Sequence, residues 1–412
     1  MRGNRLLIIV ALGVLLRLAF GLGYWVDQAL TRDEAEYLSL ARSLRAGDGF
    51  VYDAAVRNGP TDPFGRAPGY PAFLSLAGGG GATVPTSVPI MVTVTQSLVA
   101  GLGILMTAAL AARLAGPQAA TVAALLAAVY PPLVWISAYA FSEALFWPLG
   151  LCVVWTFDRA HSAAPSRTFR TALACGLLAG VGILVRPAML FFLVLAAPYW
   201  ACRRQWNSVA ALTLGALLVV LPWTIRNYEV HDRFVLVASE GGITFWTGNH
   251  PLAIGEGDMA ANPAIKIDSQ RLRGQYPDVS EEAMEPIYYR EAFAWIRAHP
   301  FDWVALQARK VYYTVVPFGP SYRLHSRLYF AGSVISYALA LLAGLVGLWR
   351  WRDRLSTLPG LWLLVASAVL VCLAFFPQER FRIPGIDPAL LILAAAGCVP
   401  RHTRPVSPAV PL

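Results

Sequence analysis

The chain alternates between long apolar runs and short polar segments, and this alternation predicts its elements. Ten runs read as helices that cross a membrane, although several are shorter than the ~20 residues of a full crossing. They cover about 6–23, 88–112, 119–137, 141–157, 171–186, 188–201, 207–223, 329–348, 358–376 and 385–399. We therefore predict an all-α polytopic membrane protein.

Two polar segments are too long to be tight turns, and they divide the chain. The first, 24–87, follows the first helix, and the second, 224–328, separates the seventh helix from the eighth. We expect a membrane region at 1–223 that includes the first segment. A small α-rich extracytoplasmic segment with juxtamembrane helices follows at 224–328. The last three helices and a cytoplasmic tail occupy 329–412.

The composition agrees with a membrane protein. Hydrophobic residues make up 57% and charged residues 14% of the chain, against roughly 45–50% and about 25% in soluble domains. The mean hydropathy of +0.54 excludes a soluble enzyme and a disordered chain. The five cysteines lack a CxxC spacing, which argues against a disulfide framework and a zinc site. No convincing cleavage site follows the first apolar run, so we expect it to be a retained helix.

The net charge of +9 indicates how the chain is oriented in the membrane, because the basic residues gather in particular segments. With the N-terminus inside, the segments predicted to lie inside contain 13 Arg and two Asp. Positive residues gather on the cytoplasmic side of membrane proteins. We therefore expect both termini in the cytoplasm, both long segments outside, and a location in the cell inner (plasma) membrane. No basic excess remains for a nucleic-acid partner.

The first outside segment opens with a helix-start signal. Thr31 and Glu34 have the spacing of a capping box, which predicts a helix over 32–46. The apolar face of this helix, which includes Leu38, suits a helix lying on the membrane surface. Glu34 is either a cap or a site residue. Asp33 lies outside the capping-box position, so its carboxylate is freer to act as a base.

Further polar residues gather at the outer ends of the predicted helices. They are Arg66 and Tyr70 in the proline-rich stretch GPTDPFGRAPGYPAF, Glu143 at the start of the fourth helix, Arg186 after the fifth, Arg226 and Asn227 after the seventh, and Arg380 and Arg382 after the ninth. Each alone could be a snorkelling anchor. Together, several guanidinium groups beside a carboxylate suit chemistry on a phosphate-linked lipid. Arg17, deeper in the first helix, is expected to snorkel outward or to meet Glu143.

The second outside segment combines a Gly-rich stretch with an amphipathic helical pattern over about 280–316. His231, His250, His299 and His325 show neither HExxH nor any other ligand spacing. We therefore predict no metal site and no cofactor, and leave dependence on a divalent metal open.

Several short motifs follow one another along the chain: the Asp-Glu pair, RAPGYP, FSEALF, RP after the fifth helix, PWTIRNY, the GN of TGNHPL, and RFRIP. Their order resembles that of the C-type, lipid-dependent glycosyltransferases, such as protein O-mannosyltransferases, the lipid A aminoarabinose transferase and lipopolysaccharide-core transferases. The resemblance implies that Asp33 activates an acceptor hydroxyl, with Glu34 beside it as a second catalytic candidate. Substrate binding or support of the site is expected of Glu143, Arg66, Tyr70, Arg226 and Asn227. It also implies that Arg186 and Arg380 or Arg382 bind the phosphate of a polyprenyl-phosphate sugar. The second outside segment is shorter than in the aminoarabinose and O-mannosyl enzymes, which leaves the acceptor open.

These observations predict an integral-membrane glycosyltransferase, a hexosyl- or pentosyltransferase. It would move a sugar from a polyprenyl-phosphate donor to a hydroxyl of a glycolipid, lipopolysaccharide or protein on the outer face of the membrane. Attack assisted by a single base would invert the anomeric carbon. The alternative is a transporter or flippase for a lipid-linked sugar, which would need polar residues or broken helices near mid-membrane.

Overall fold

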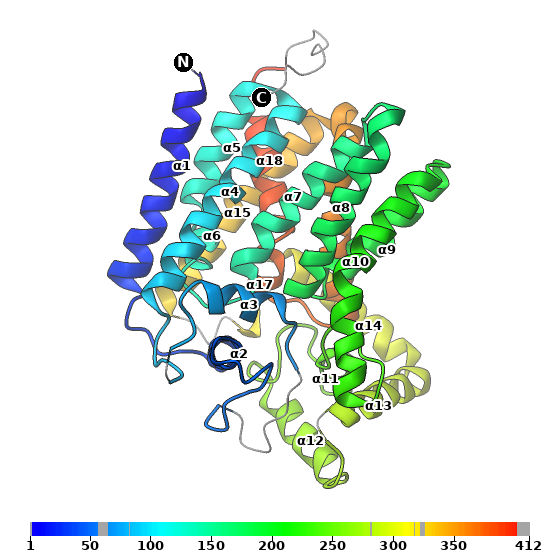
Figure 1. The fold of residues 1–412 in the computed structure, drawn as a ribbon. Helices are drawn as coiled ribbons and strands as arrows, with labels where there is room; N and C mark the ends of the chain where they lie inside the picture. Colours follow the sequence, from blue (N-terminus) through cyan, green and yellow to red (C-terminus); the bar gives the residue numbers. More distant parts are fainter. Residues whose placement is uncertain are drawn as a thin grey trace.

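The computed structural model describes residues 2–56, 65–81, 83–280, 282–316, 318–321 and 326–401. Within these residues every regular element is a helix. The long helices run side by side in one bundle, and shorter helices cover one of its ends (Figure 1). The fold class predicted from the sequence, an all-α polytopic membrane protein, is therefore confirmed.

Helical structure coincides with each of the ten predicted spans. The bundle contains α1 (Arg2–Ala19) with the π-helical turn η1 (Phe20–Tyr24), α4 (Ile90–Ala115), α5 (Pro117–Val129), α6 (Pro131–Trp135), α7 (Glu143–His161), α8 (Pro165–Val185), α9 (Met189–Cys202), α10 (Trp206–His231), α15 (Arg327–Arg350), α16 (Pro359–Ala374) and α18 (Ile386–Gly397). By length and composition, α1 with η1, α4, α8, α10 and α15 can cross a membrane. Helices α5, α9, α16 and α18 are apolar but shorter. The protein is thus a multi-pass membrane protein.

One predicted span, 119–137, is broken into α5 and α6 by consecutive prolines. Tyr130 is extended because it precedes Pro131. Pro131 and Pro132 have no N–H groups, so the carbonyls of Ala127 and Ala128 lack their usual donors.

Arg17 of α1 occupies this break. Its guanidinium donates to the carbonyl oxygens of Ala127 at 2.9 Å and Ala128 at 3.0 Å, and its side chain is buried. The expectation that Arg17 snorkels outward or meets Glu143 was therefore wrong. The two prolines leave the Ala127 and Ala128 carbonyls without backbone donors inside the bundle, and Arg17 donates to both of them instead.

Helix α10 is longer than predicted. The sequence placed its end near residue 223, but the helix continues through Pro222 to His231. Beyond the proline, Thr224 Oγ1 donates to the Leu236 carbonyl at 2.8 Å and Asn227 Nδ2 to the Val235 carbonyl at 3.1 Å. Contacts with the segment that follows the helix therefore outweigh the one backbone hydrogen bond that proline removes.

Helices of both long polar segments lie together at the end of the bundle opposite to the start of α1 and the end of α18 (Figure 1). They are α2 (Arg32–Ala46), α3 (Gly69–Leu76), α11 (Gly241–Gly248), α12 (Pro263–Gly274), the 3-10 turn η2 (Glu282–Met284), α13 (Glu285–Ala298) and α14 (Pro300–Val315). Helix α17 (Glu379–Arg382) lies at the same end, and the 3-10 turn η4 (Arg352–Thr357) connects α15 to α16. Residues 57–64 (which include the start of the proline-rich stretch), His325 and the tail (402–412) lie outside the described residues.

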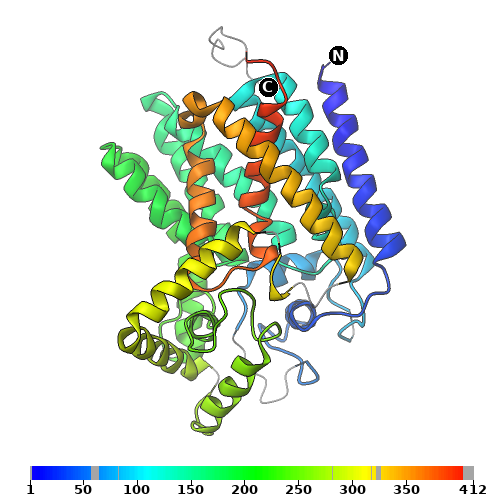
Figure 2. The same ribbon diagram turned by 180° about the vertical axis from the view of Figure 1, so that it is seen from behind.

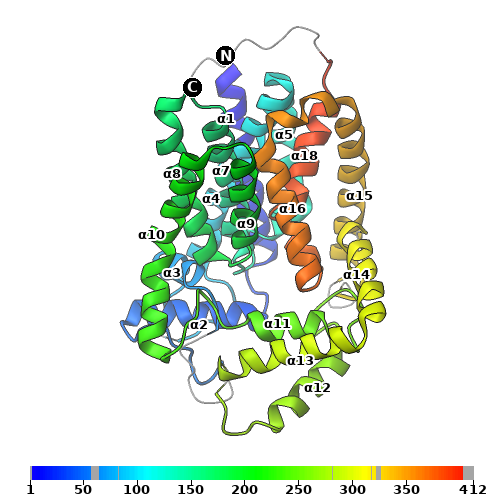
Figure 3. The ribbon, with the colours of Figure 1, turned by 90° about the vertical axis from the view of Figure 1, so that its right-hand side faces the viewer.

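Helix α2 has the predicted bounds and the predicted capping box. It lies crosswise beneath the bundle (Figure 3). Its apolar residues, including Leu38 and Ala41, are fully buried in the main core of the protein. The expectation that this face rests on lipid is therefore corrected, because α3 and the bundle cover it.

The helical pattern predicted over 280–316 forms two helices rather than one. Helix α13 ends at Ala298 and α14 begins at Pro300. His299 between them leaves the helical conformation, with φ −132° and ψ 58°, because the proline that follows disfavours the α region at this residue. Helix α14 then rises toward the end of α16 (Figure 2).

Candidate functional site

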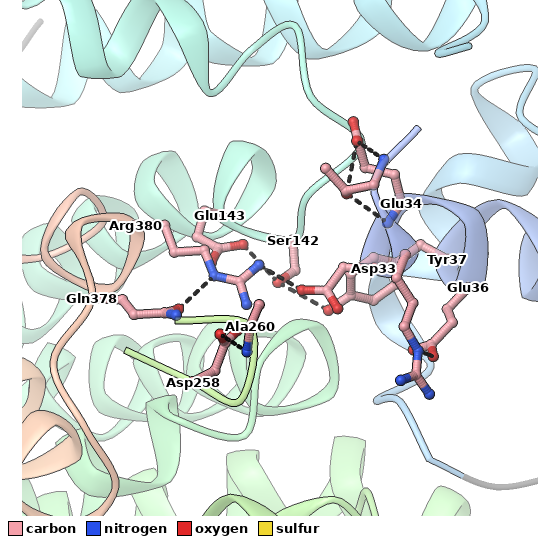
Figure 4. Close-up of polar contacts among 12 residues, drawn as sticks. Asp33, Glu34, Glu36, Tyr37, Ser142, Glu143, Asp258, Ala260, Gln378 and Arg380 are labelled. Atoms are coloured by element: carbon pink, nitrogen blue, oxygen red, sulfur yellow. Dashed lines mark hydrogen bonds and ion pairs between the residues drawn. The ribbon is translucent and has the colours of Figure 1, made fainter. Parts of the chain in front are cut away.

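The carboxylate of Asp33 lies between two guanidinium groups from distant parts of the chain. Arg66 Nη2 contacts Oδ1 at 2.6 Å, and Arg380 Nη1 contacts Oδ2 at 2.6 Å. In Figure 4 the Arg380 side chain extends from α17 toward Asp33. Burial raises the pKa of Asp33, but the charges of Arg66 and Arg380 outweigh burial and hold that pKa below its ordinary value. Asp33 is therefore ionised at neutral pH.

The local sequence explains why Asp33 and Glu34 point in different directions. Glu34 is the capping-box residue: its Oε2 accepts from the Thr31 backbone N–H at 2.8 Å. Its Oε1 accepts from the Ala140 backbone N–H at 2.9 Å, which ties α2 to the segment before α7. Both oxygens are thus engaged away from Arg380 (Figure 4). This geometry favours a structural role for Glu34 over the catalytic role predicted from the sequence.

Arg66 joins the two outside segments. Besides Asp33 it contacts Glu36 at 2.7 Å and Glu240, from the second segment, at 3.4 Å. Its guanidinium also lies over the ring of Tyr37, 5.0 Å from the centroid. Sequence reasoning missed Glu36, although its spacing of three residues from Asp33 places both on one face of α2. No local signal pointed to Glu240.

A second ion pair lies beside the first. Arg186 Nη1 contacts Glu143 Oε1 at 2.8 Å and donates to Ser142 Oγ at 3.0 Å. Arg380 Nε approaches the same Glu143 oxygen at 3.9 Å, so the two pairs are continuous. Glu143 begins α7, and Arg186 is held extended after α8 by the proline that follows it. We call Asp33, Arg66, Arg380, Glu143 and Arg186 the acidic–arginine cluster.

Arg382 turns away from this cluster. Its Nε contacts Asp387 Oδ1 at 2.9 Å, and its guanidinium lies over the ring of Tyr337. The Tyr130 hydroxyl donates to the other Asp387 oxygen at 3.0 Å. Arg382 is thus buried among bundle helices, whereas the Arg380 side chain is 27% exposed at the cluster. Of Arg380 and Arg382, the two alternatives predicted to bind phosphate together with Arg186, the structure brings only Arg380 to Asp33.

Three other residues predicted for the site have their hydrogen bonds and ring contacts outside the acidic–arginine cluster. Tyr70, predicted among the polar residues at the outer ends of the helices, is fully buried, and its hydroxyl donates to Gln96 Oε1 at 2.6 Å. Arg226 lies over the ring of Trp223. Asn227 is buried and binds the carbonyl of Val235. Tyr70 and Asn227 are thus buried, whereas Arg226 is half-buried. Their positions in the sequence carried no sign of this.

The cluster does not offer a set of metal ligands. Nowhere among the described residues do three His, Cys, Asp or Glu side chains gather at a distance suited to one metal ion. Asp33 and Glu36, the two closest acids of α2, both contact Arg66 instead. The positive charge between these carboxylates is therefore a guanidinium group.

No protein-family model matches the chain, and no curated protein matches it. Several solved structures, however, are similar to it. The oligosaccharyltransferase of Archaeoglobus fulgidus aligns with a TM-score of 0.56 at 16% identity, over 96% of this chain and 50% of that chain. The archaeal oligosaccharyltransferase AglB from Archaeoglobus fulgidus, in complex with an inhibitory peptide and a dolichol-phosphate, aligns with a TM-score of 0.52 at 16% identity, over 96% of this chain and 50% of that chain. The chain has the C-type glycosyltransferase fold.

This C-type fold is shared over only part of the larger proteins. The chain spans about half the length of the oligosaccharyltransferase chains that it matches. ArnT from Cupriavidus metallidurans, bound to undecaprenyl phosphate, aligns with a lower TM-score of 0.42 at 16% identity, over 95% of this chain and 77% of that chain. At such identities the likeness shows the fold, and the activity has to be argued from the cluster.

Proposed function

We propose that the protein is an integral-membrane glycosyltransferase that takes a sugar from a polyprenyl-phosphate donor. The acceptor is a hydroxyl of a glycolipid, lipopolysaccharide or protein at the outer face of the inner membrane. The observation that carries this proposal is the ionised Asp33 held between Arg66 and Arg380, beside Arg186. The C-type fold supports it, as does the dolichol-phosphate, a polyprenyl phosphate, bound by one structural neighbour.

The arginines are suited to a lipid-linked phosphate. A polyprenyl tail lies in the bilayer, so its phosphate lies at headgroup depth. Helices α2 and α17, which carry Asp33 and Arg380, lie together at one end of the helix bundle (Figure 1). Arg186 and Arg380 are partly exposed there. Guanidinium groups bind phosphate oxygens with two parallel hydrogen bonds. Such donors can stabilise the charge that develops on the departing phosphate.

Binding of the donor would also make Asp33 a stronger base. A phosphate that recruits Arg380 removes one of the two cations that lower the pKa of Asp33. The pKa of Asp33 then rises, and the carboxylate becomes a stronger base at the moment the donor is in place. Glu143 lies within reach of the same arginine and can balance its charge in the absence of phosphate.

The chemical step is a single displacement. Asp33 accepts the proton of the acceptor hydroxyl, and the hydroxyl oxygen forms a bond to the anomeric carbon. The bond from that carbon to the phosphate oxygen breaks, and polyprenyl phosphate leaves with the electron pair. The anomeric configuration is inverted. A general base of this kind contributes about 10²–10⁴-fold to the rate.

A deletion strain tests the proposal whichever sugar the protein transfers. Mass spectrometry of its surface glycans and glycolipids should show the loss of one sugar, restored by the wild-type gene. Asp33→Asn keeps the size of the side chain but removes the base, so it should not restore the product. Asp48→Asn, at an exposed position after the same helix, is the matched control and should restore it. Full restoration by Asp33→Asn at normal expression would contradict the proposed base.

A further inference from the structure

The position of Arg380 depends on a short connection between two helices. Helix α16 ends at Ala374 and α17 begins at Glu379, so residues 375–378 link them. The last carbonyl groups of a helix have no partner within it and must be satisfied by other groups. Whatever binds these carbonyls therefore fixes the start of the linker and the direction of Arg380.

Two side chains of the second outside segment bind the end of α16. Lys310 of α14 donates from Nζ to the Leu373 carbonyl at 2.8 Å and to Asn249 Oδ1 at 3.3 Å. Asn249, directly after α11, donates from Nδ2 to the Ala374 carbonyl at 2.8 Å. Lys310 is fully buried and Asn249 is 1% exposed. Asn249 is the Asn of the GN motif that the sequence singled out.

Two glycines of the same segment continue this contact along the linker. Gly248 packs so closely on the Phe375 carbonyl oxygen that a Cβ would collide with it. Gly257 donates its backbone N–H to the Pro377 carbonyl at 3.1 Å from a φ of +81°, a conformation that favours glycine. Together, Lys310, Asn249 and these glycines contact the backbone carbonyls of residues 373, 374, 375 and 377, at the end of α16 and along the linker.

The choice of lysine at position 310 fits this environment. The chain has only two lysines, Lys266 and Lys310, among 33 basic residues. The acceptors of the Lys310 ammonium, a carbonyl and an amide oxygen, are uncharged. Burial lowers its pKa to about 7. An arginine would keep its charge in this buried place, whereas lysine can release a proton.

We propose that Asn249 and Lys310 are positioning residues that hold the α16–α17 linker so that Arg380 reaches Asp33. They act through Arg380, and none of their hydrogen bonds goes to Asp33. The second outside segment thereby controls the geometry of the acidic–arginine cluster. The contact itself is independent of the activity, and its consequence for the donor rests on the proposed function.

Amide hydrogen exchange of the full-length protein in nanodiscs tests the contact directly. In Lys310→Met, which keeps the length of the side chain but removes its donors, exchange of peptides covering 375–382 should become at least about tenfold faster. Lys266→Met, at an exposed position on α12, is the matched control and should leave exchange unchanged. Asn249→Ala removes the Ala374 contact separately and serves if Lys310→Met folds poorly. Unchanged exchange in folded Lys310→Met or Asn249→Ala overturns the proposal.

Binding of undecaprenyl phosphate tests whether the contact acts through Arg380. Lys310→Met and Arg380→Lys should each raise its Kd by about tenfold, and the double variant should be no weaker than Arg380→Lys alone, because residues that act as one unit are not additive. Additive losses would overturn the action through Arg380. If the wild type did not bind this lipid, the proposed function would fail, and hydrogen exchange alone would decide whether the contact positions the linker.

Discussion

Arg380 and Arg382 are two positions apart in one helical turn, yet they contact different parts of the molecule. Two residues so spaced on a helix point about 200° apart, so the sequence could predict that only one faces the site. It could not predict which one. Asp387 decides this by pairing with Arg382 inside the bundle. Arg380 is left to reach Asp33.

Lysine replacements should separate the roles of these arginines. Arg186→Lys and Arg380→Lys keep the charge but lose the planar fork that binds phosphate, so we expect the KM for the lipid donor to rise about tenfold. Arg382→Lys should instead lower the melting temperature with little change in KM, because this side chain packs on Tyr337 and pairs with Asp387. Donor titrations and thermal melts of the three variants check this. Unchanged donor kinetics in both Arg186→Lys and Arg380→Lys would remove them from phosphate binding.

The pKa of Asp33 gives a prediction about pH. The base works only when ionised, so kcat/KM falls as pH drops through the pKa of Asp33. Arg66 holds that pKa below its ordinary value. Arg66→Gln should therefore raise the pKa and move the acid limb of kcat/KM to higher pH. Arg42→Gln is the control, because it removes an arginine that pairs with Asp53 instead. The acid limb of kcat/KM in this variant should lie at the same pH as in the wild type. A common acid limb for Arg66→Gln and the wild type would exclude Asp33 as the titrating base.

At the scale of elements, boundaries were predicted well where the deciding signal is local. The capping box of Thr31 and Glu34 fixes the start of α2, and both residues lie within one turn. The end of α10 was predicted wrongly because distant groups decide it, among them the Val235 carbonyl that binds Asn227. The hydrogen-bond partner of Lys310 could not be predicted from the sequence either, since the Leu373 carbonyl lies 63 residues away along the chain.

The buried lysine between α14 and α16 predicts how stability depends on pH. Burial lowers the pKa of Lys310 to about 7. Between that value and the ordinary pKa of lysine, the unfolded chain binds more protons than the folded one, so stability falls as pH drops, by up to about 1.4 kcal/mol per unit. Lys310→Met lacks this charge. The melting temperature of Lys310→Met minus that of the wild type should therefore be largest below pH 7 and shrink toward pH 10. A difference independent of pH would show that Lys310 stays charged when folded.

At the scale of the whole molecule, the sequence predicted ten helical segments and a cluster of charges at one end, because apolar runs and their flanks are properties of the chain itself. It could not predict that Glu240 completes the environment of Arg66. It also could not predict that the second outside segment holds the α16–α17 linker. These contacts join residues far apart in the sequence, and only the packing of the whole bundle brings them together.

The positive-inside pattern predicts the orientation of the molecule. A cysteine introduced by Gly274→Cys in α12 has open space around it and should react with a membrane-impermeant maleimide in intact spheroplasts. The exposed native Cys202 and Cys398 adjoin the segments predicted to lie inside and should react only after the membrane is opened. Labelling in the reverse order would place the acidic–arginine cluster in the cytoplasm.

Arg17 has a consequence for biosynthesis. Its acceptors on Ala127 and Ala128 are 110 and 111 residues further along the chain, so α1 leaves the ribosome well before they exist. At ~5–20 residues per second this interval lasts about 5–20 s. An arginine within the bilayer costs about 2.5–3.5 kcal/mol on insertion scales, so the nascent first helix is poorly anchored until α5 arrives. We therefore expect alkali to extract a chain truncated after residue 115 more readily than one truncated after residue 140.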